Sequence, residues 1–177
     1  LRRRGIATVA GNHDRWYLLG TSRHDPEALP VGALAGTDAE WLACLPRTLT
    51  FDTPAGKAMV AHAFGADDFC WIERDTPVDA IRAHKQWAAL RDGGYALHLA
   101  GHTHRPMVRF AADAGDGPWR GVTFVNAGTL HRGHDPCACI VDLGRGVVEW
   151  HPLRGDGFGP PRVVALPKID AKSSGGE

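Results

Sequence analysis

The chain has 177 residues, enough for one domain with a buried core. Its 20 Lys and Arg residues balance its 20 Asp and Glu residues, so no net field would attract long nucleic acid or an anionic membrane. Hydrophobic residues make up 44% of the chain, the usual share in a globular protein, and none of their runs approaches the roughly 20 residues of a transmembrane helix.

The first part of the chain predicts a strand and a helix. Residues 5–10 read as a buried strand that ends at Gly11. Thr37 and Glu40 have the spacing of a capping box, in which each side chain satisfies a backbone amide at a helix start. We therefore expect a short helix over residues 38–45.

A hairpin and the clearest helix follow. Two strand-like stretches, 47–53 and 57–63, flank a proline- and glycine-containing turn and predict a hairpin. Residues 75–94 predict a single helix that is capped by Thr76 and ended by Gly93. Its buried face is expected to carry four apolar side chains at helical spacing: Val78, Ile81, Trp87 and Leu90.

The rest of the chain is rich in strand signals. Runs of apolar and β-branched residues separated by Gly- and Asp-rich turns predict five strands, at 95–100, 106–112, 122–128, 138–144 and 146–152. The sum is an α/β domain over residues 1–155 in which strands outnumber helices. Residues 156–177 end in a Ser- and Gly-rich run and are expected to be a flexible tail.

Three of the predicted strands end in the same kind of residue. Ala10, Ala61 and Ala100 each close an apolar run and lead into polar side chains. Ligands in α/β sheets gather outside the carboxyl ends of strands. If these strands are neighbours, five side chains that could ligate Mn, Fe, Zn or Ni converge: Asn12, His13, His62, His102 and His104.

This ordered set resembles the last three motifs of the calcineurin-like metallophosphoesterases. The motifs are Gly-Asn-His-Asp at 11–14, a lone histidine at His62 and Gly-His-Thr-His at 101–104. The segment 125–130 resembles one that follows these motifs in small bacterial phosphodiesterases of that family. The resemblance covers residues 5–150 and implies a layered α-β-β-α sandwich.

The resemblance also implies a cofactor, since members of that family hold two divalent metal ions bridged by a carboxylate and a water. Mn²⁺ is expected first, with Fe, Zn and Ni as alternatives. By resemblance, Asn12, His62 and His102 would bind the second ion and His104 the first.

The resemblance gives the neighbouring residues a role in catalysis. His13 would lie beside the phosphate and either stabilise the transition state or protonate the leaving oxygen. Asp14 would orient its imidazole. Arg105 follows the second histidine motif directly and would approach a substrate phosphate, although a solvated arginine is an equal alternative.

The chain departs from the family pattern at its start. The family places an Asp-x-His and a Gly-Asp before the first of these motifs, whereas residues 1–10 contain neither Asp nor His. We therefore expect an N-terminally truncated domain that lacks the first strand or strands of the fold. Such a chain would hold only part of the metal site, bind metal poorly and show weak or no catalysis alone.

The predicted function is metal-dependent hydrolysis of a phosphodiester or phosphomonoester in a small substrate. Within enzymes, a protein phosphatase or a dinucleotide polyphosphate hydrolase is the alternative. Outside enzymes, the alternative is a non-catalytic scaffold or binding module, because the retromer scaffold subunit has the same fold. The five intact side chains argue against the scaffold, which has no chemical need of them.

Other residues near these motifs leave alternatives open. His131 and His134 are expected in a loop near the mouth of the site. Phe69 and Trp71 could line a pocket for a base or an aromatic leaving group, with core packing as the alternative. The four cysteines form no CxxC pair, which indicates a reduced, cytoplasmic protein without a disulfide framework.

Overall fold

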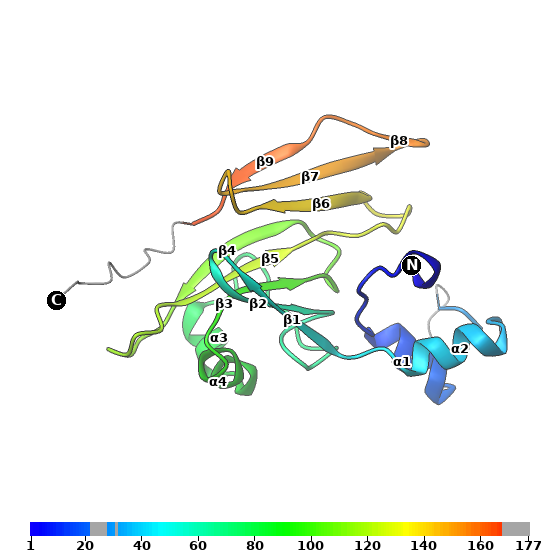
Figure 1. Cartoon of the computed structure of the whole chain (residues 1–177), viewed down its shortest axis with the longest axis horizontal. Helices are drawn as coiled ribbons and strands as arrows, with labels where there is room; N and C mark the ends of the chain where they lie inside the picture. Colours follow the sequence, from blue (N-terminus) through cyan, green and yellow to red (C-terminus); the bar gives the residue numbers. More distant parts are fainter. Residues whose placement is uncertain (22–27, 31, 168–177) are drawn as a thin grey trace.

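The computed structural model of the chain describes residues 1–21, 28–30 and 32–167. Two β-sheets lie one above the other, and two helices cover the outer face of the larger sheet (Figure 1). Two further helices near the N-terminus lie to one side of the sheets, close to their loops (Figure 1). This arrangement confirms the expected mixed α/β fold with two sheets.

The larger sheet has five strands in the order β1-β2-β3-β5-β4. Their bounds are Thr48–Thr53 for β1, Gly56–Ala61 for β2, Tyr95–Ala100 for β3, Met107–Ala112 for β4 and Gly121–Asn126 for β5. The central strands β2, β3 and β5 run parallel, and the hairpin partners β1 and β4 pair antiparallel at the two edges. The carboxyl ends of the three parallel strands therefore lie at one edge of the sheet.

The smaller sheet is built by the last four strands. They are β6 (Cys137–Asp142), β7 (Val147–Arg154), β8 (Gly157–Phe158) and β9 (Arg162–Ala165). Both β8 and β9 pair with β7, so strand structure extends into the segment that the sequence predicts as a flexible tail. The rest of that predicted tail, residues 168–177, lies outside the described residues.

The helices are short. A 3₁₀ turn (Arg2–Arg4) precedes α1 (Asn12–Leu19), α2 (Gly36–Ala43), α3 (Val78–Ala83) and α4 (Lys85–Asp92). Among the residues that the structure describes, none of these helices has the length and apolar character needed to cross a bilayer.

The main core lies between the larger sheet and helices α3 and α4. Ile81, Trp87 and Leu90, three of the four residues predicted for the buried helical face, are at most 3% exposed. The fourth, Val78, is partly buried against the same cluster. On the sheet side this core contains Phe64 and Phe124, whose rings meet edge to face at 5.6 Å. Burial of these side chains attaches the helical layer to the sheet.

A second core lies between the two sheets. Val125, Cys137, Val148 and Trp150 are buried there, and Trp150 Nε1 donates a hydrogen bond to the backbone oxygen of Asn126. All six residues of β5 are buried, because helices cover one face of this strand and the smaller sheet covers the other. β5 is therefore the most enclosed strand of the larger sheet.

The expected sandwich has four layers, α-β-β-α, whereas the described part of the chain forms three: the helices α3 and α4, the larger sheet and the smaller sheet. Alternate residues of β6 face opposite sides of the sheet, so Cys139 packs into the second core while Ile140 is 51% exposed. No described helix covers this outer face (Figure 1).

The predicted strand at residues 5–10 is wrong for the described part of the chain. Residues 6–10 pair with neither sheet, and the Ala10 amide donates to the Pro46 oxygen in a loop. A strand needs a neighbouring strand for its backbone groups, and each of the three parallel strands already has a neighbour on both sides. The segment instead leads directly into α1 at Asn12.

Two helix predictions also need correction. Helix α2 begins one residue before Thr37, with Ala35 as the N-cap and no side-chain cap, so the predicted capping box does not form. The single helix predicted over 75–94 is two helices, because His84 is extended (φ −77°, ψ 139°). The Nδ1 atom of His84 accepts a hydrogen bond from the Gln86 amide, 3.2 Å away, and so caps α4.

The buried histidine of β3 predicts acid sensitivity. His98 is 1% exposed, and burial lowers its pKa to about 4. The imidazole of His98 is protonated near pH 6.5 in the unfolded chain and only near pH 4 in the folded chain. The contribution of His98 to the free energy of unfolding is therefore fully present above pH 6.5 and is lost as the pH falls toward 4. We expect this residue to reduce the free energy of unfolding by about 2 kcal/mol between pH 7 and pH 5.

Urea unfolding at the two pH values, followed by tryptophan fluorescence, measures this loss. In His98→Gln the non-titrating side chain should make the loss smaller by that amount. An equal loss in the wild type and the variant would contradict the assignment.

Candidate metal centre

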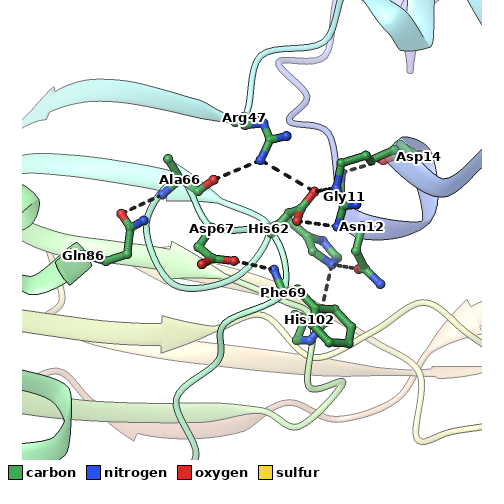
Figure 2. A network of polar contacts seen from close by, with 12 residues as sticks. Gly11, Asn12, Asp14, Arg47, His62, Ala66, Asp67, Phe69, Gln86 and His102 are labelled. Atoms are coloured by element: carbon green, nitrogen blue, oxygen red, sulfur yellow. Dashed lines mark hydrogen bonds and ion pairs between the residues drawn. The ribbon is translucent and has the colours of Figure 1, made fainter. Parts of the chain in front are cut away.

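The candidate site lies at the edge where the parallel strands β2, β3 and β5 end. His62 follows β2 directly, Gly101 and His102 follow β3, and Asn126 is the last residue of β5. The register places Leu99 beside both Val60 and Val125, so the three strands end at nearly the same level. Helix α1 approaches this edge with its first residue, Asn12 (Figure 2).

Three atoms with lone pairs meet at this edge. The Nε2 atom of His62 lies 2.7 Å from Oδ1 of Asn12 and 3.1 Å from Nδ1 of His102. The rings of His62 and His102 stand edge to face, with their centroids 5.1 Å apart. The structure thus brings together Asn12, His62 and His102, which the sequence predicts as the ligands of one metal ion (Figure 2).

The surroundings keep the two imidazoles in the form that binds metal. Burial lowers the pKa of His62 to about 4, with a further contribution from His102. Burial, and then the neighbouring His104, lower the pKa of His102 as well. Both rings are therefore neutral at pH 7, as metal ligation by histidine requires.

The chemistry of these donors fits a divalent transition metal ion. Imidazole nitrogens suit Mn, Fe, Zn or Ni, and an amide oxygen is a neutral third donor. In the described part of the chain, no three His, Cys, Asp or Glu side chains are grouped so that they could hold a metal. A metal site at this edge would therefore need the amide oxygen of Asn12 in addition to the two imidazoles.

Gly11 lets helix α1 approach His62. A methyl group at Gly11 would lie 2.7 Å from Nδ1 of His62 and 2.9 Å from Cε1, closer than real Cβ contacts come. The φ of Gly11 is −107°, which any residue can adopt, so the requirement for glycine comes from this contact. The glycine before Asn12 thus sets the distance between the amide and the imidazole.

The loop after β3 holds two histidines in a strained backbone conformation. His102 has φ 68° and His104 has φ 60°, and they are the only described residues other than glycine with positive φ. Such a conformation costs on the order of 1 kcal/mol or more per residue and is retained where the surrounding structure enforces it. Here the left-handed conformation occurs twice in the loop that directly follows β3.

Asn126 is the residue that holds this loop in place. Its Nδ2 donates to the Gly101 oxygen at 2.5 Å and to Oγ1 of Thr103 at 3.0 Å, and its Oδ1 accepts from the Gly128 amide at 2.9 Å. The side chain is 3% exposed. The sequence places this residue in a predicted strand and in the segment 125–130 that resembles the family, and its anchoring role becomes visible with the parallel pairing of β3 and β5.

His104 lies in a different group from the three converging donors. Its Nδ1 atom is 2.6 Å from Nδ1 of His134, and its ring stacks on that of His131 with centroids 6.2 Å apart. Both partners lie in the loop between β5 and β6. The sequence predicts this loop near the mouth of the site, and the structure places it against His104. The predicted role of His104 as a ligand of a first metal stays a prediction.

Helix α1 presents His13 at the mouth and uses Asp14 as a cap. His13 is exposed, and its ring centroid lies 5.1 Å from that of Trp16. Burial is the main cause of the lowered pKa of both His62 and His102, and a charge on His13 contributes to a smaller extent. His13 therefore lies close to both rings. Oδ2 of Asp14 accepts from the Gly11 amide at 2.7 Å. This contact closes the first turn of α1, and the predicted role of Asp14 in orienting His13 stays a prediction.

The side chain of Arg105 pairs with a carboxylate in the structure. Its Nη1 lies 3.3 Å from Oε2 of Glu73, and the side chain is 77% exposed. Its predicted contact with a substrate phosphate also stays a prediction.

One buried carboxylate near the site was not predicted. Asp68 is 8% exposed and accepts from Nε of Arg15 at 2.7 Å and from Nη2 at 2.9 Å. This hydrogen-bonded guanidinium holds the pKa of Asp68 below its usual range. The pair joins α1 to the loop after β2, and therefore joins the segment of Asn12 to that of His62. The two adjacent aspartates soon after His62 were the sequence signal for it.

Comparison with known proteins identifies the family of the chain. The sequence profile of the calcineurin-like phosphoesterase superfamily domain matches residues 1–146. A comparison with curated protein sequences found no match.

Among solved structures, hypothetical protein PH1004 from Pyrococcus horikoshii OT3 is similar at 17% identity and a TM-score of 0.55, over 86% of this chain and 64% of that one. The chain therefore spans less than two thirds of that protein. Wild-type Vps29 of Entamoeba histolytica in complex with zinc is 16% identical, with a TM-score of 0.41 over 69% and 62% of the two chains. A predicted phosphoesterase from Streptococcus pneumoniae TIGR4 is 15% identical, with a TM-score of 0.38 over 72% and 67%.

The contact at Gly11 predicts the effect of a single methyl group. In Gly11→Ala the new Cβ must displace the His62 ring from Asn12, so we expect Mn²⁺ affinity to fall roughly tenfold or more. Gly117→Ala is the matched control, because its Cβ would meet open space. Calorimetric titration with Mn²⁺ compares the three proteins, and equal affinities would contradict this view of the site.

The anchoring of the loop predicts a loss of stability. Asn126→Ala removes all three of the hydrogen bonds made by that side chain and should lower the free energy of unfolding by about 3 kcal/mol. Thr103→Ala removes one of them and should cost less than half as much. Urea unfolding of both variants tests the order, and a larger loss in Thr103→Ala would contradict it.

Proposed function

Since the chain belongs to the calcineurin-like phosphoesterase superfamily, we propose that it hydrolyses phosphoester bonds with the help of divalent metal ions. The substrate class is a small phosphodiester or phosphomonoester. Mn²⁺ is the first choice of metal ion, with Fe, Zn and Ni as alternatives.

The observation that carries the proposal is the meeting of Asn12, His62 and His102. These residues lie at the start of α1 and directly after β2 and β3, and the donor atoms of Asn12 and His102 lie within 3.1 Å of the central Nε2 atom of His62. Neutral, half-buried imidazoles at a strained loop need an explanation, which metal binding provides.

The residues of the candidate site have separate tasks in the proposed reaction. Asn12, His62 and His102 would hold the metal ion, which would supply Lewis acidity toward a phosphoryl oxygen and toward water. Asn126 and Gly11 fix these donors, and so fix where the phosphate binds. His13, exposed at the start of α1, is assigned the donation of a proton to the leaving oxygen in this proposal.

A second metal ion would have one donor assigned within residues 1–177. His104 is that donor in the resemblance, and residues 1–10 contain no Asp or His to join it. We therefore propose that these 177 residues hold part of a binuclear centre. The group of His104, His131 and His134 is not used in this assignment.

The first test is metal-dependent turnover by the protein. Metal-free protein should be inactive on bis-p-nitrophenyl phosphate, and added Mn²⁺ should restore activity. His13→Ala should lower kcat by roughly 10²–10⁴ and leave Mn²⁺ affinity unchanged, because His13 is assigned to proton transfer. His102→Ala should weaken Mn²⁺ binding itself.

The control is His151→Ala, since this half-buried histidine on β7 pairs with Glu149, outside the candidate site. It should leave kcat and metal affinity near wild type. Absence of metal-dependent turnover of both this diester and p-nitrophenyl phosphate would contradict the proposed function.

The number of metal ions tests the partial site. Titration of residues 1–177 with Mn²⁺ should reveal one bound ion per chain. Two tight sites on these residues would contradict the proposed division of the centre.

A further inference from the structure

Three aromatic side chains form an exposed surface beside the candidate metal centre. They are Trp16 of α1 and Phe69 and Trp71 of the segment between β2 and α3, and we refer to them as the aromatic ledge. Phe69 is 49% exposed and Trp71 is 48% exposed. Exposure of two such large rings side by side, with a third adjoining, is the kind of apolar patch that marks a binding surface.

The ledge is continuous with the candidate metal centre. The ring centroids of Phe69 and Trp71 lie 5.5 Å and 5.4 Å from that of His102, and Figure 2 shows Phe69 beside His102. At its other end, Trp16 lies 5.6 Å from Phe69 and 5.1 Å from His13. The ledge therefore connects the proposed proton donor to a proposed metal ligand by a row of contacting rings.

The backbone of the ledge is held in place. Asp68, directly before Phe69, makes the two-bonded ion pair with Arg15 on α1. The Phe69 amide donates to Oδ1 of Asp67 at 3.1 Å, and the Phe64 amide donates to the Cys70 oxygen at 2.6 Å. These contacts fix the direction in which Phe69 points.

The core beneath the ledge is already filled. Phe64 is 2% exposed and Ile72 is 8% exposed, and both belong to the main core. Phe69 and Trp71 lie between them in the sequence, yet they point outward. Since protein interiors are close-packed, the core has no room for two more aromatic rings. Their exposure is thus a property of the fold, and the alternative of core packing is wrong for these two residues.

We propose that the aromatic ledge binds the planar aromatic group of the substrate, a nucleobase or an aryl group esterified to the phosphate. The location of the phosphate in this proposal rests on the proposed function. Stacking on exposed aromatic side chains is the usual way in which proteins hold such groups without reading their hydrogen-bonding edges. The ledge would then make the chain selective for aromatic over aliphatic phosphate esters.

Ligand binding tests the ledge independently of turnover. The protein with saturating Mn²⁺ is titrated calorimetrically with 5′-AMP and with ribose 5-phosphate, which differ by the base. A second pair, phenyl phosphate and ethyl phosphate, separates an aryl group from a nucleobase. We expect each aromatic ligand to bind roughly tenfold more tightly than its aliphatic partner.

Substitutions in the ledge should remove this difference. In Phe69→Leu and Trp71→Leu, which keep apolar bulk but lack the ring, the affinity for 5′-AMP should fall toward that for ribose 5-phosphate. The affinity for ribose 5-phosphate itself should not change. Trp71→Phe should restore much of the preference. Phe158→Leu is the matched control, because it removes a ring that is 62% exposed on β8.

Equal binding within both ligand pairs, or the same preference in the Leu variants as in the wild type, would contradict the proposed role of the aromatic ledge. Preference for phenyl phosphate alone would assign the ledge to aryl esters. A ring-dependent preference in a protein without turnover would support the ledge and contradict the proposed function. Thermal melts of the Leu variants establish that they are folded, and the control variant must keep the preference.

Discussion

The parallel pairing of β2, β3 and β5 is the constraint on which the site depends. Since parallel strands all point the same way, their carboxyl ends meet at one edge, and side chains distant in sequence become neighbours there. His62 and His102 are 40 residues apart in the chain, yet their ring nitrogens lie 3.1 Å apart. A slip of one residue in the register between β2 and β3 would separate them.

The energy that holds this edge together comes from the cores on both faces of the sheet. Left-handed backbone at His102 and His104, and half-buried neutral imidazoles, are unfavourable local features. They are stabilised by Asn126, which lies at the end of the most enclosed strand and whose backbone oxygen accepts from Trp150 in the smaller sheet. The smaller sheet thus supports the site indirectly, although the proposed metal donors come from elsewhere.

The sequence predicted the parts of the fold that depend on local patterns. The β1–β2 hairpin and the buried face of Ile81 and Leu90 follow from periodicity, and the meeting of His62 with His102 follows from their positions after two strands. Asn12 meets them from the start of a helix, and not from the end of the strand predicted at residues 5–10. The break at His84 was missed because helical spacing of apolar residues continues across it.

Long-range contacts could not be predicted from local patterns. The pairing of Arg15 with Asp68 joins residues 53 positions apart, and the anchoring by Asn126 needs the neighbouring positions of β3 and β5. The strand predicted at residues 5–10 and the tail predicted from residue 156 show the same limit, since strand formation depends on a partner strand. Val147 to Trp150 supply that partner for β9.

The metal donors and the aromatic ledge come from different segments of the chain, which has a consequence for specificity. His62 directly follows β2, where the position of its backbone is set by the sheet, whereas Phe69 and Trp71 come later in the connecting segment. The ion pair of Asp68 with Arg15 fixes that segment against α1 without using any of the proposed donors. The rings that face a substrate can therefore vary while the strand ends and the proposed metal site stay unchanged. Chemistry is assigned to the rigid edge of the sheet, and the choice of substrate to the loop beside it.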